Sequence, residues 1–389
     1  MLPSYMIWNS SPIFLQLGIF ALRWYGMLWA LSFLLGLQIL FFIYKKEGKP
    51  LKDIDALFLH TMLGTMIGAR LGHVLFYDFP DFLQHPLEIF LPVVFEPTFK
   101  FVGYRGLASH GASLGILLAV YIYVNKIIIR LWPPRLTIKN QHRVGQSYLW
   151  VFDRLVIVVA LGGCLIRIGN FMNSEIVGRP THSQYGVLFV HDATQQLLRS
   201  NSAIASVEIA KSNTETTNDS SYLPVTLTVV FNHGSFEEKA VRNFLEQNIK
   251  DLLVKDYYVS QHIYETETRP LSYTLSKNRR GAYVAHIDTL GIARHPAVLY
   301  EAFSCLVLFL LLFCRWYAKK SSLKSGEMFG LFLVIVFGLR IFYELLKQSK
   351  IVFAGELITL RMPQLLSLPL VIVGILLLVY SRRPSKITE

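Results

Sequence analysis

Residues 19–46 read IFALRWYGMLWALSFLLGLQILFFIYKK, a run of apolar residues that ends in two lysines. A helix needs about 20 such residues to cross the hydrocarbon core of a bilayer, and this run is long enough. A backbone exposed to lipid must satisfy its own hydrogen bonds, so the run is expected to be helical. The stretch therefore predicts a transmembrane helix at the start of the chain.

Similar runs recur, and the composition agrees with them. The 389 residues are 53% hydrophobic and 16% charged, whereas a soluble domain is about 25% charged. This composition excludes a simple cytosolic enzyme, a disordered chain and a basic nucleic-acid-binding domain. We predict an α-helical polytopic membrane protein with seven transmembrane helices, at 19–44, 54–77, 107–129, 148–171, 296–317, 326–347 and 363–381.

The positive charge is distributed unevenly, and its distribution sets the expected orientation. Residues 182–290 hold 10 Lys and Arg against 12 Asp and Glu, whereas the rest of the chain holds 28 against 14. The net charge of +12 therefore belongs to the membrane part, and no nucleic-acid partner is expected. Basic clusters follow the first, third, fifth and seventh spans, at 45–52, 130–143, 315–324 and 382–386. Because positive loops stay cytoplasmic, the N-terminus is expected to be periplasmic and the C-terminus cytoplasmic.

The polar stretch between the fourth and fifth spans is too long for a structureless loop. It contains a strand-like run at 224–231 and a helix-like run at 236–257. We interpret it as a small α+β extracytoplasmic insertion. The expected domains are 1–181 with four spans, 182–290 as a periplasmic head domain, and 291–389 with three spans and a basic tail.

The cysteines and the N-terminus carry little functional signal. Cys164, Cys305 and Cys314 lie in apolar runs without C-x-x-C spacing, so we expect no disulfide framework, no metal site and no cofactor. Residues 1–11 lack Lys and Arg, and a cleavable signal peptide is not expected.

Ionisable residues within the spans are costly and usually functional. The predicted topology places the arginines Arg70, Arg167 and Arg340 in the outer half of the membrane. It places several other polar residues at a similar depth, namely Tyr25, His110, Asn170, Glu301 and Glu344. Three arginines at one depth repel one another and require a counter-anion. A phosphate suits the planar donor fork of arginine.

Structural explanations of the same residues stay open. Arg340 and Glu344 have the i,i+4 spacing of a local ion pair on one helix. Arg70 can be a structural partner of Glu301. A lone histidine at a helix start, such as His110, is more often a hydrogen-bonded interface residue than a base.

The densest polar stretch, RIGNFMNSEIVGR at 167–179, resembles the signature of the bacterial prolipoprotein diacylglyceryl transferase family. Six further motifs stand in the family's order, namely RWYG at 23–26, GARLG at 68–72, SHG at 109–111, RHPAVLYE at 294–301, GLRIFYE at 338–344 and QLLSLP at 364–369. The resemblance covers all seven spans, roughly residues 1–190 and 290–380. The family often has an Arg three residues after the helix-six Glu, where this chain has Lys347, and a Tyr four residues before the helix-six Arg, where it has Val336. Pro363 stands where a Gly is usual. The insertion is also longer than the family's usual head region.

The resemblance implies an inner-membrane enzyme. This family transfers the sn-1,2-diacylglyceryl group of phosphatidylglycerol to the lipobox cysteine of a preprolipoprotein. The products are a thioether and glycerol phosphate. By motif position, the resemblance implies that His110 is the essential histidine and that Arg167 and Arg340 handle the phospholipid.

Further substrate-binding positions follow from the same matches and from depth. The motifs imply Tyr25, Asn170, Glu175, Gly178 and Glu344 as binding residues, and we add Arg70 and Glu301 from their expected depth. We expect Glu175 and Glu344 to hold the arginines. Two other functions stay open, a secondary transporter of an anionic solute and a non-catalytic membrane scaffold. The absence of an internal repeat argues against a transporter.

Overall fold

The computed structural model describes residues 5–18, 20–76, 79, 89, 93–94, 100–101, 108–130, 135–138, 143–183, 185–212, 222–234, 237–347, 353–354, 359–360 and 362–383. The chain divides into two compact units, and each is described by itself. The first unit comprises Met1–Trp29, Cys164–Ser304 and Leu339–Ser367. The second comprises Ala30–Gly163, Cys305–Gly338 and Leu368–Glu389.

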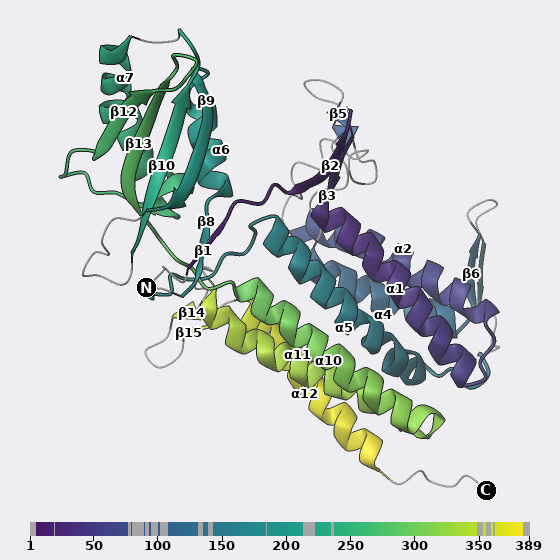
Figure 1. Ribbon diagram of the computed structural model, residues 1–389. Coiled ribbons are helices and arrows are strands. Elements are labelled where there is room, and N and C mark those ends of the chain that lie inside the picture. Colours follow the sequence, from purple (N-terminus) through teal and green to yellow (C-terminus); the bar gives the residue numbers. More distant parts are fainter. Residues whose placement is uncertain are drawn as a thin grey trace, which may run out of the picture. The chain divides into compact units, whose positions relative to one another are not determined.

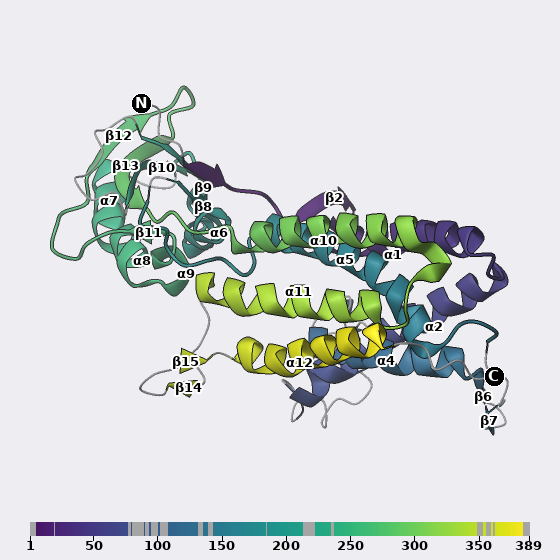
Figure 2. The same cartoon turned by 90° about the horizontal axis from the view of Figure 1, so that it is seen from below.

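Among the described residues, a long helix lies at each position where the sequence predicts a span (Figures 1 and 2). These helices are α1 (Trp24–Lys46), α2 (Lys52–Phe76), α4 (Ser109–Val124), α5 (Tyr148–Met172), α10 (Ala297–Lys319), α11 (Glu327–Tyr343) and α12 (Met362–Arg382). In the part of the chain that the structure describes, five of them are long and apolar enough to cross a membrane, namely α1, α5, α10, α11 and α12, counting short 3-10 extensions of α10 and α11. The helices α2 and α4 fall outside this group. The chain is a helical membrane protein that also contains sheets.

The first span begins later than predicted. Residues 13–17 and 20–23 form a hairpin, β2 (Ile13–Leu17) with β3 (Phe20–Arg23), and α1 starts only at Trp24. Gly18 allows the turn because its φ is 58°, a left-handed value that glycine adopts without strain. The apolar run that predicts the first span therefore begins before α1, within the hairpin.

The third span is shorter than predicted, because α4 ends at Val124. The side chain of Asn125 donates to the Tyr121 carbonyl at 2.9 Å, and Lys126 adopts φ 49°. The following isoleucines form β6 (Ile127–Arg130), which pairs with β7 (Arg135–Ile138). These β-branched residues extend the apolar run without extending the helix.

Glycines bring α2 and α4 of the second unit into backbone contact. A Cβ at Gly115 would overlap the Gly64 carbonyl oxygen, and a Cβ at Gly111 would overlap that of Gly68. A Cβ at Gly72 would lie 2.7 Å from the Gly111 Cα. Small residues at such spacing let membrane helices approach closely.

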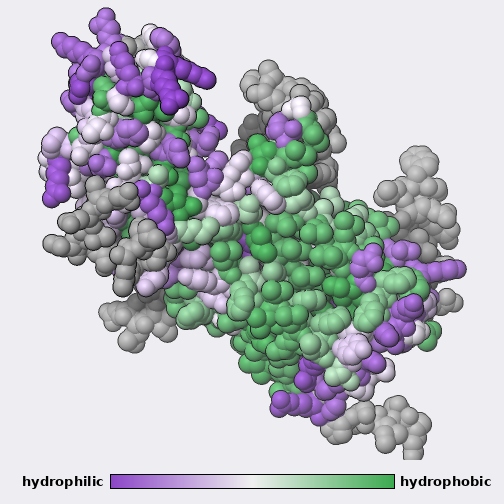
Figure 3. All heavy atoms as spheres, in the orientation of Figure 1, coloured by the Kyte–Doolittle hydropathy of each residue, from purple (hydrophilic) through white to green (hydrophobic). Residues whose placement is uncertain are grey.

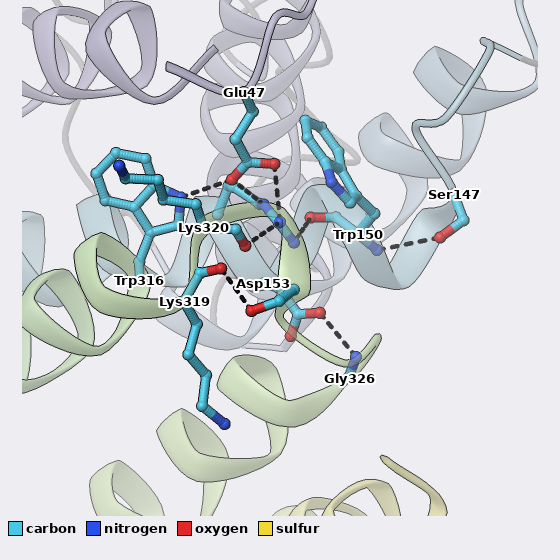
Figure 4. Close-up of polar contacts among 10 residues, drawn as sticks. Glu47, Ser147, Trp150, Asp153, Trp316, Lys319, Lys320 and Gly326 are labelled. Atoms are coloured by element: carbon cyan, nitrogen blue, oxygen red, sulfur yellow. Dashed lines mark hydrogen bonds and ion pairs between the residues drawn. The ribbon is translucent and has the colours of Figure 1, made fainter. Parts of the chain in front are cut away.

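A buried ionic cluster links four helices of this second unit (Figure 4). The Arg154 Nη2 donates to Glu47 at 2.9 Å, and both side chains are 1% exposed. The indole of Trp316 donates to the same carboxylate at 2.6 Å. Next to them, Asp153 accepts the backbone N–H of Gly326 at 2.7 Å. Asp153 thus satisfies a free donor at the start of α11.

The first unit contains a five-stranded antiparallel sheet built from 204–291. Its strands are β9 (Ile204–Lys211), β10 (Leu223–Phe231), β11 (Ile263–Tyr264), β12 (Tyr273–Lys277) and β13 (Tyr283–Gly291). Their order is β11-β13-β10-β9, and β12 also pairs with β13. Hydrophilic residues gather over this part of the surface in Figure 3, whereas the helices are largely covered by hydrophobic residues.

Short helices pack against the sheet. They are α6 (His191–Ser200), α7 (Glu238–Phe244), a π turn (Leu245–Ile249), α8 (Lys250–Lys255) and α9 (Tyr257–Ser260). The helical run predicted at 236–257 corresponds to α7, the π turn and α8, which follow one another without a gap from Glu238 to Lys255. Asp256 starts a new helix by accepting the backbone N–H groups of Tyr258 and Val259.

The chain's N-terminal strand joins this unit. The strand β1 (Met6–Trp8) pairs in parallel with β8 (Val187–Phe189). The Tyr5 hydroxyl donates to the Pro224 carbonyl at 2.6 Å, and Tyr5 is 1% exposed. This unit also contains the short pair of β14 (Phe353–Ala354) with β15 (Thr359–Leu360), and the second unit contains that of β4 (Val93–Val94) with β5 (Lys100–Phe101).

Candidate active site

Arg167 is fixed near the C-terminal end of α5 by two neighbours. Its Nε lies 2.5 Å from the Glu301 carboxylate on α10, and its Nη1 donates to the Asn170 Oδ1 at 3.2 Å. Asn170 is one helical turn further along α5, so the i,i+3 spacing brings the two side chains together. Both contacts restrict the guanidinium, and its other N–H groups have no acceptor among the described residues, so they can serve another acceptor.

A hydrogen-bonded relay continues from Asn170 into the loop at 173–178. The Asn170 amide donates to one oxygen of Glu175 at 2.7 Å, and the Asn173 amide donates to the other at 3.1 Å. The backbone N–H of Glu175 donates to the Asn170 carbonyl at 2.9 Å. Glu175 therefore acts on Arg167 through Asn170, one contact further away than the sequence suggested.

Glu301 also pairs with a lysine that was not among the predicted site residues. The Lys347 Nζ pairs with the second oxygen of Glu301 and lies 3.9 Å from Glu344. Lys347, Glu301 and Glu344 are each less than 9% exposed. Buried charges require pairing of this kind. The sequence signal for this position is that Lys347 stands where the family often has an arginine.

Arg340 on α11 belongs to the same charged group. It interacts electrostatically with Glu301 and Glu344, which attract it, and with Arg167, which repels it. The two arginines that the sequence placed at one depth are therefore close enough to influence each other. Such a pair favours an anion between them or beside them.

Tyr25, the second residue of α1, lies against α5. A Cβ at Gly169 would be 3.1 Å from the Tyr25 ring, so the glycine makes room for it. Tyr25 lies within electrostatic range of Arg167 and Glu175. Tyr25 on α1 therefore lies beside the charged residues that α5, α10 and α11 contribute.

Gly178 holds the loop against the start of α10. Its N–H donates to the His295 carbonyl at 3.2 Å, and a Cβ at this position would overlap that carbonyl. The Gly178 carbonyl accepts from Arg294 at 3.0 Å, and Arg294 also donates to Gln261 of the sheet region at 2.9 Å. Arg294 opens the motif RHPAVLYE but is not among the predicted site residues. It is 3% exposed and ties the loop to the sheet region.

Arg70 and His110 belong to the second unit and are described there. Arg70 on α2 donates to the Ile89 carbonyl at 2.8 Å. His110 lies in the first turn of α4, where the Ala108 N–H donates to the Ala69 carbonyl at 2.9 Å. The Gly111 contact then places this turn directly on α2. Of the ten predicted site residues, eight belong to the first unit, and Arg70 and His110 belong to the second.

The family model described as prolipoprotein diacylglyceryl transferase matches residues 12–380. The chain belongs to the prolipoprotein diacylglyceryl transferase family. The resemblance drawn from the seven motifs is thereby confirmed, and the transporter alternative finds no support.

Individual relatives agree with the family. A protein of Tolumonas auensis named phosphatidylglycerol--prolipoprotein diacylglyceryl transferase is 31% identical over 379 residues, which cover 97% of this chain and 98% of that protein. A protein of Bacteroides fragilis with the same name is 26% identical over 95% of this chain and 92% of its own length. One of Chloroherpeton thalassium is 42% identical over 48% of this chain and 60% of its own length.

Proposed function

We propose that this chain transfers the diacylglyceryl group of phosphatidylglycerol to the lipobox cysteine thiol of a preprolipoprotein. The thiol sulfur attacks the glycerol carbon that carries the phosphate ester, and the carbon–oxygen bond breaks. The bridging oxygen leaves with glycerol phosphate, and the product is a thioether. The names of the relatives support the two substrates, and the family match over residues 12–380 supports the reaction.

The fixed guanidinium of Arg167 is the observation that carries this proposal. Glu301 and Asn170 hold Arg167 in place. Prepositioned donors stabilise charge as it develops on a leaving oxygen. Arg167 and Arg340 are proposed to bind the phosphate, and Tyr25 and Asn170 to orient the headgroup. Glu301 and Glu344 balance the charge of the arginines.

His110 is proposed as the base that accepts the thiol proton. Histidine titrates near neutral pH and can accept a proton under physiological conditions. Arg70, which belongs to the same unit as His110, is proposed to attract the negatively charged phospholipid with a further positive charge. The attacking sulfur belongs to the substrate, so the cysteines of this chain are not needed as nucleophiles.

The membrane arrangement is part of the proposal. We infer seven transmembrane spans in the bacterial inner membrane, with a periplasmic N-terminus, a cytoplasmic C-terminus and the active site in the outer half of the bilayer. The five long apolar helices and the basic clusters at 45–52 and 382–386 support it. We retain 1–181, 182–290 and 291–389 as the proposed domains, with 182–290 as the periplasmic head domain.

A reconstituted transfer assay tests the reaction. The purified chain is combined with phosphatidylglycerol and a lipobox peptide, and mass spectrometry measures the diacylglyceryl adduct on the cysteine. We expect an adduct that is absent with a Cys→Ser peptide and is at least about 100-fold reduced by Arg167→Ala, the scale of losing a charge-stabilising group. An intact, folded chain that forms no adduct would refute the proposal. His110→Gln with unchanged transfer would refute only the assignment of the base.

A further inference from the structure

Two polar side-chain atoms at the end of the relay are buried without a hydrogen-bond partner among the described residues. They are the Asn173 Oδ1 and the Ser174 Oγ. Ser174 is 8% exposed. An unsatisfied buried polar group costs free energy, and native proteins rarely keep one without a reason. Two on adjacent residues, next to Asn170 and Glu175, point to a ligand with matching polar groups.

The chemistry of the two atoms is defined by their neighbours. The Asn173 amide nitrogen donates to Glu175 at 3.1 Å, because an amide oxygen facing that carboxylate would be repelled. The amide oxygen is therefore left as an acceptor. The Ser174 hydroxyl can both donate and accept. Together they match a group that carries two hydroxyls, each of which can donate and accept.

The backbone at this position is held in an uncommon conformation. Ser174 has φ 55° and Ile176 has φ 56°, although neither is glycine. A glycine at 174 would fit this backbone without strain. The serine therefore adds only its hydroxymethyl group, and Ser174→Gly removes the hydroxyl while suiting the backbone.

We propose that Asn173 and Ser174 bind the glycerol hydroxyls of the phospholipid headgroup and so select phosphatidylglycerol over anionic lipids without hydroxyls. This inference rests on the proposed function, which supplies the lipid. The relay runs from Arg167, the phosphate end, through Asn170 and Glu175 to Asn173. The headgroup follows the same order from phosphate to hydroxyls. Its two hydroxyls are on the second and third carbons after the phosphate ester oxygen.

A binding measurement on the full chain tests the selection. Native mass spectrometry in detergent compares phosphatidylglycerol with phosphatidylpropanol of the same acyl chains, which has the same charge but no headgroup hydroxyls. We expect the wild type to bind phosphatidylglycerol about tenfold more tightly, the scale of one or two hydrogen bonds. We expect Ser174→Gly and Asn173→Ala each to reduce this preference to about threefold or less.

The control is Ile176→Gly, which relieves the same left-handed conformation two residues away but removes an apolar, exposed side chain. It should keep the wild-type preference. Equal binding of the two lipids by the wild type, or an unchanged preference in Ser174→Gly, would overturn the inference. Ser174→Gly decides the matter even if Asn173→Ala unfolds. A lipid preference without any diacylglyceryl adduct in the transfer assay would refute the proposed function and leave the binding inference standing.

Discussion

The single carboxylate of Glu301 forms ion pairs with two cationic side chains. It pairs with Arg167 through one oxygen and with Lys347 through the other. Because Lys347 shares the carboxylate, the charge of Arg167 is only partly neutralised. The group therefore keeps an attraction for an anion while each buried charge retains a partner.

The buried pair Glu47–Arg154 predicts a large effect of one substitution. Glu47→Gln should lower the free energy of unfolding by about 3–5 kcal/mol, because it leaves a buried guanidinium without its counter-charge. Unfolding titrations in mixed detergent micelles measure the change. The matched control is Glu238→Gln, whose exposed i,i+4 pair with Arg242 should contribute nothing measurable. Equal effects of the two substitutions would contradict the prediction.

His262 predicts the acid sensitivity of the sheet region. Burial and the nearby charge of Arg294 lower the pKa of His262 from 6.5 to about 4. The folded state therefore keeps the imidazole neutral where the unfolded chain binds a proton. Stability should fall as the pH drops from 6.5 toward 4, by about 3 kcal/mol from this group.

The measurement is amide hydrogen exchange of 204–291 as a function of pH. His262→Gln should flatten the pH dependence in this window. His286→Gln removes an exposed histidine that bonds Thr228, and it should leave the dependence as in the wild type. A steep acid dependence that persists in His262→Gln would assign it to other groups.

At the scale of elements, the contact of α2 with α4 predicts that glycine cannot be replaced there. Gly115→Ala would place a methyl group on the Gly64 carbonyl and should destabilise the protein by about 1–3 kcal/mol or more, the cost of overpacking. Because α4 carries His110, transfer should fall as well. Gly338→Ala, whose added methyl meets nothing within 4 Å, should not reduce stability. Thermal unfolding in detergent compares the two variants.

The helices of this fold could be predicted to within a few residues from sequence, and the exceptions have local causes. The predicted span 148–171 agrees with α5 (Tyr148–Met172), since polar residues bound the apolar run. The span predicted at 107–129 is too long at its C-terminal end, because hydropathy alone does not distinguish a helix from a strand of β-branched apolar residues that begins at Ile127. The sheet order could not be predicted, because β13 pairs with strands on both sides that lie far apart in sequence.

The candidate site was predictable where local motifs carry it. Arg167, Asn170 and Glu175 lie on one stretch of chain, and helical spacing joins the first two. Lys347 was missed as a site residue because its partner Glu301 is on another helix. Arg294 was missed for the same reason, since its acceptors are the carbonyls of distant residues.

At the scale of the whole molecule, the positive-inside orientation predicts which surfaces can be labelled from outside the cell. On a background with Cys305 and Cys314 replaced by serine, Ser276→Cys in β12 should react with a membrane-impermeant maleimide in intact spheroplasts. Ser322→Cys, between α10 and α11, should react only after permeabilisation. Both serines are exposed, so access across the membrane alone separates them. Labelling in the reverse order would invert the proposed topology.

The pairing of β1 with β8 has a consequence for synthesis of the chain. Met6 of β1 pairs with Val187 of β8, which lies 181 residues later in the chain. At about 5–20 residues per second, a ribosome needs roughly 10–40 s to add that length. During this interval, the first strand exists without its partner, and its unpaired edge is open to wrong strands. A translation pause before residue 187 would therefore lengthen the time in which a chaperone must protect residues 6–8.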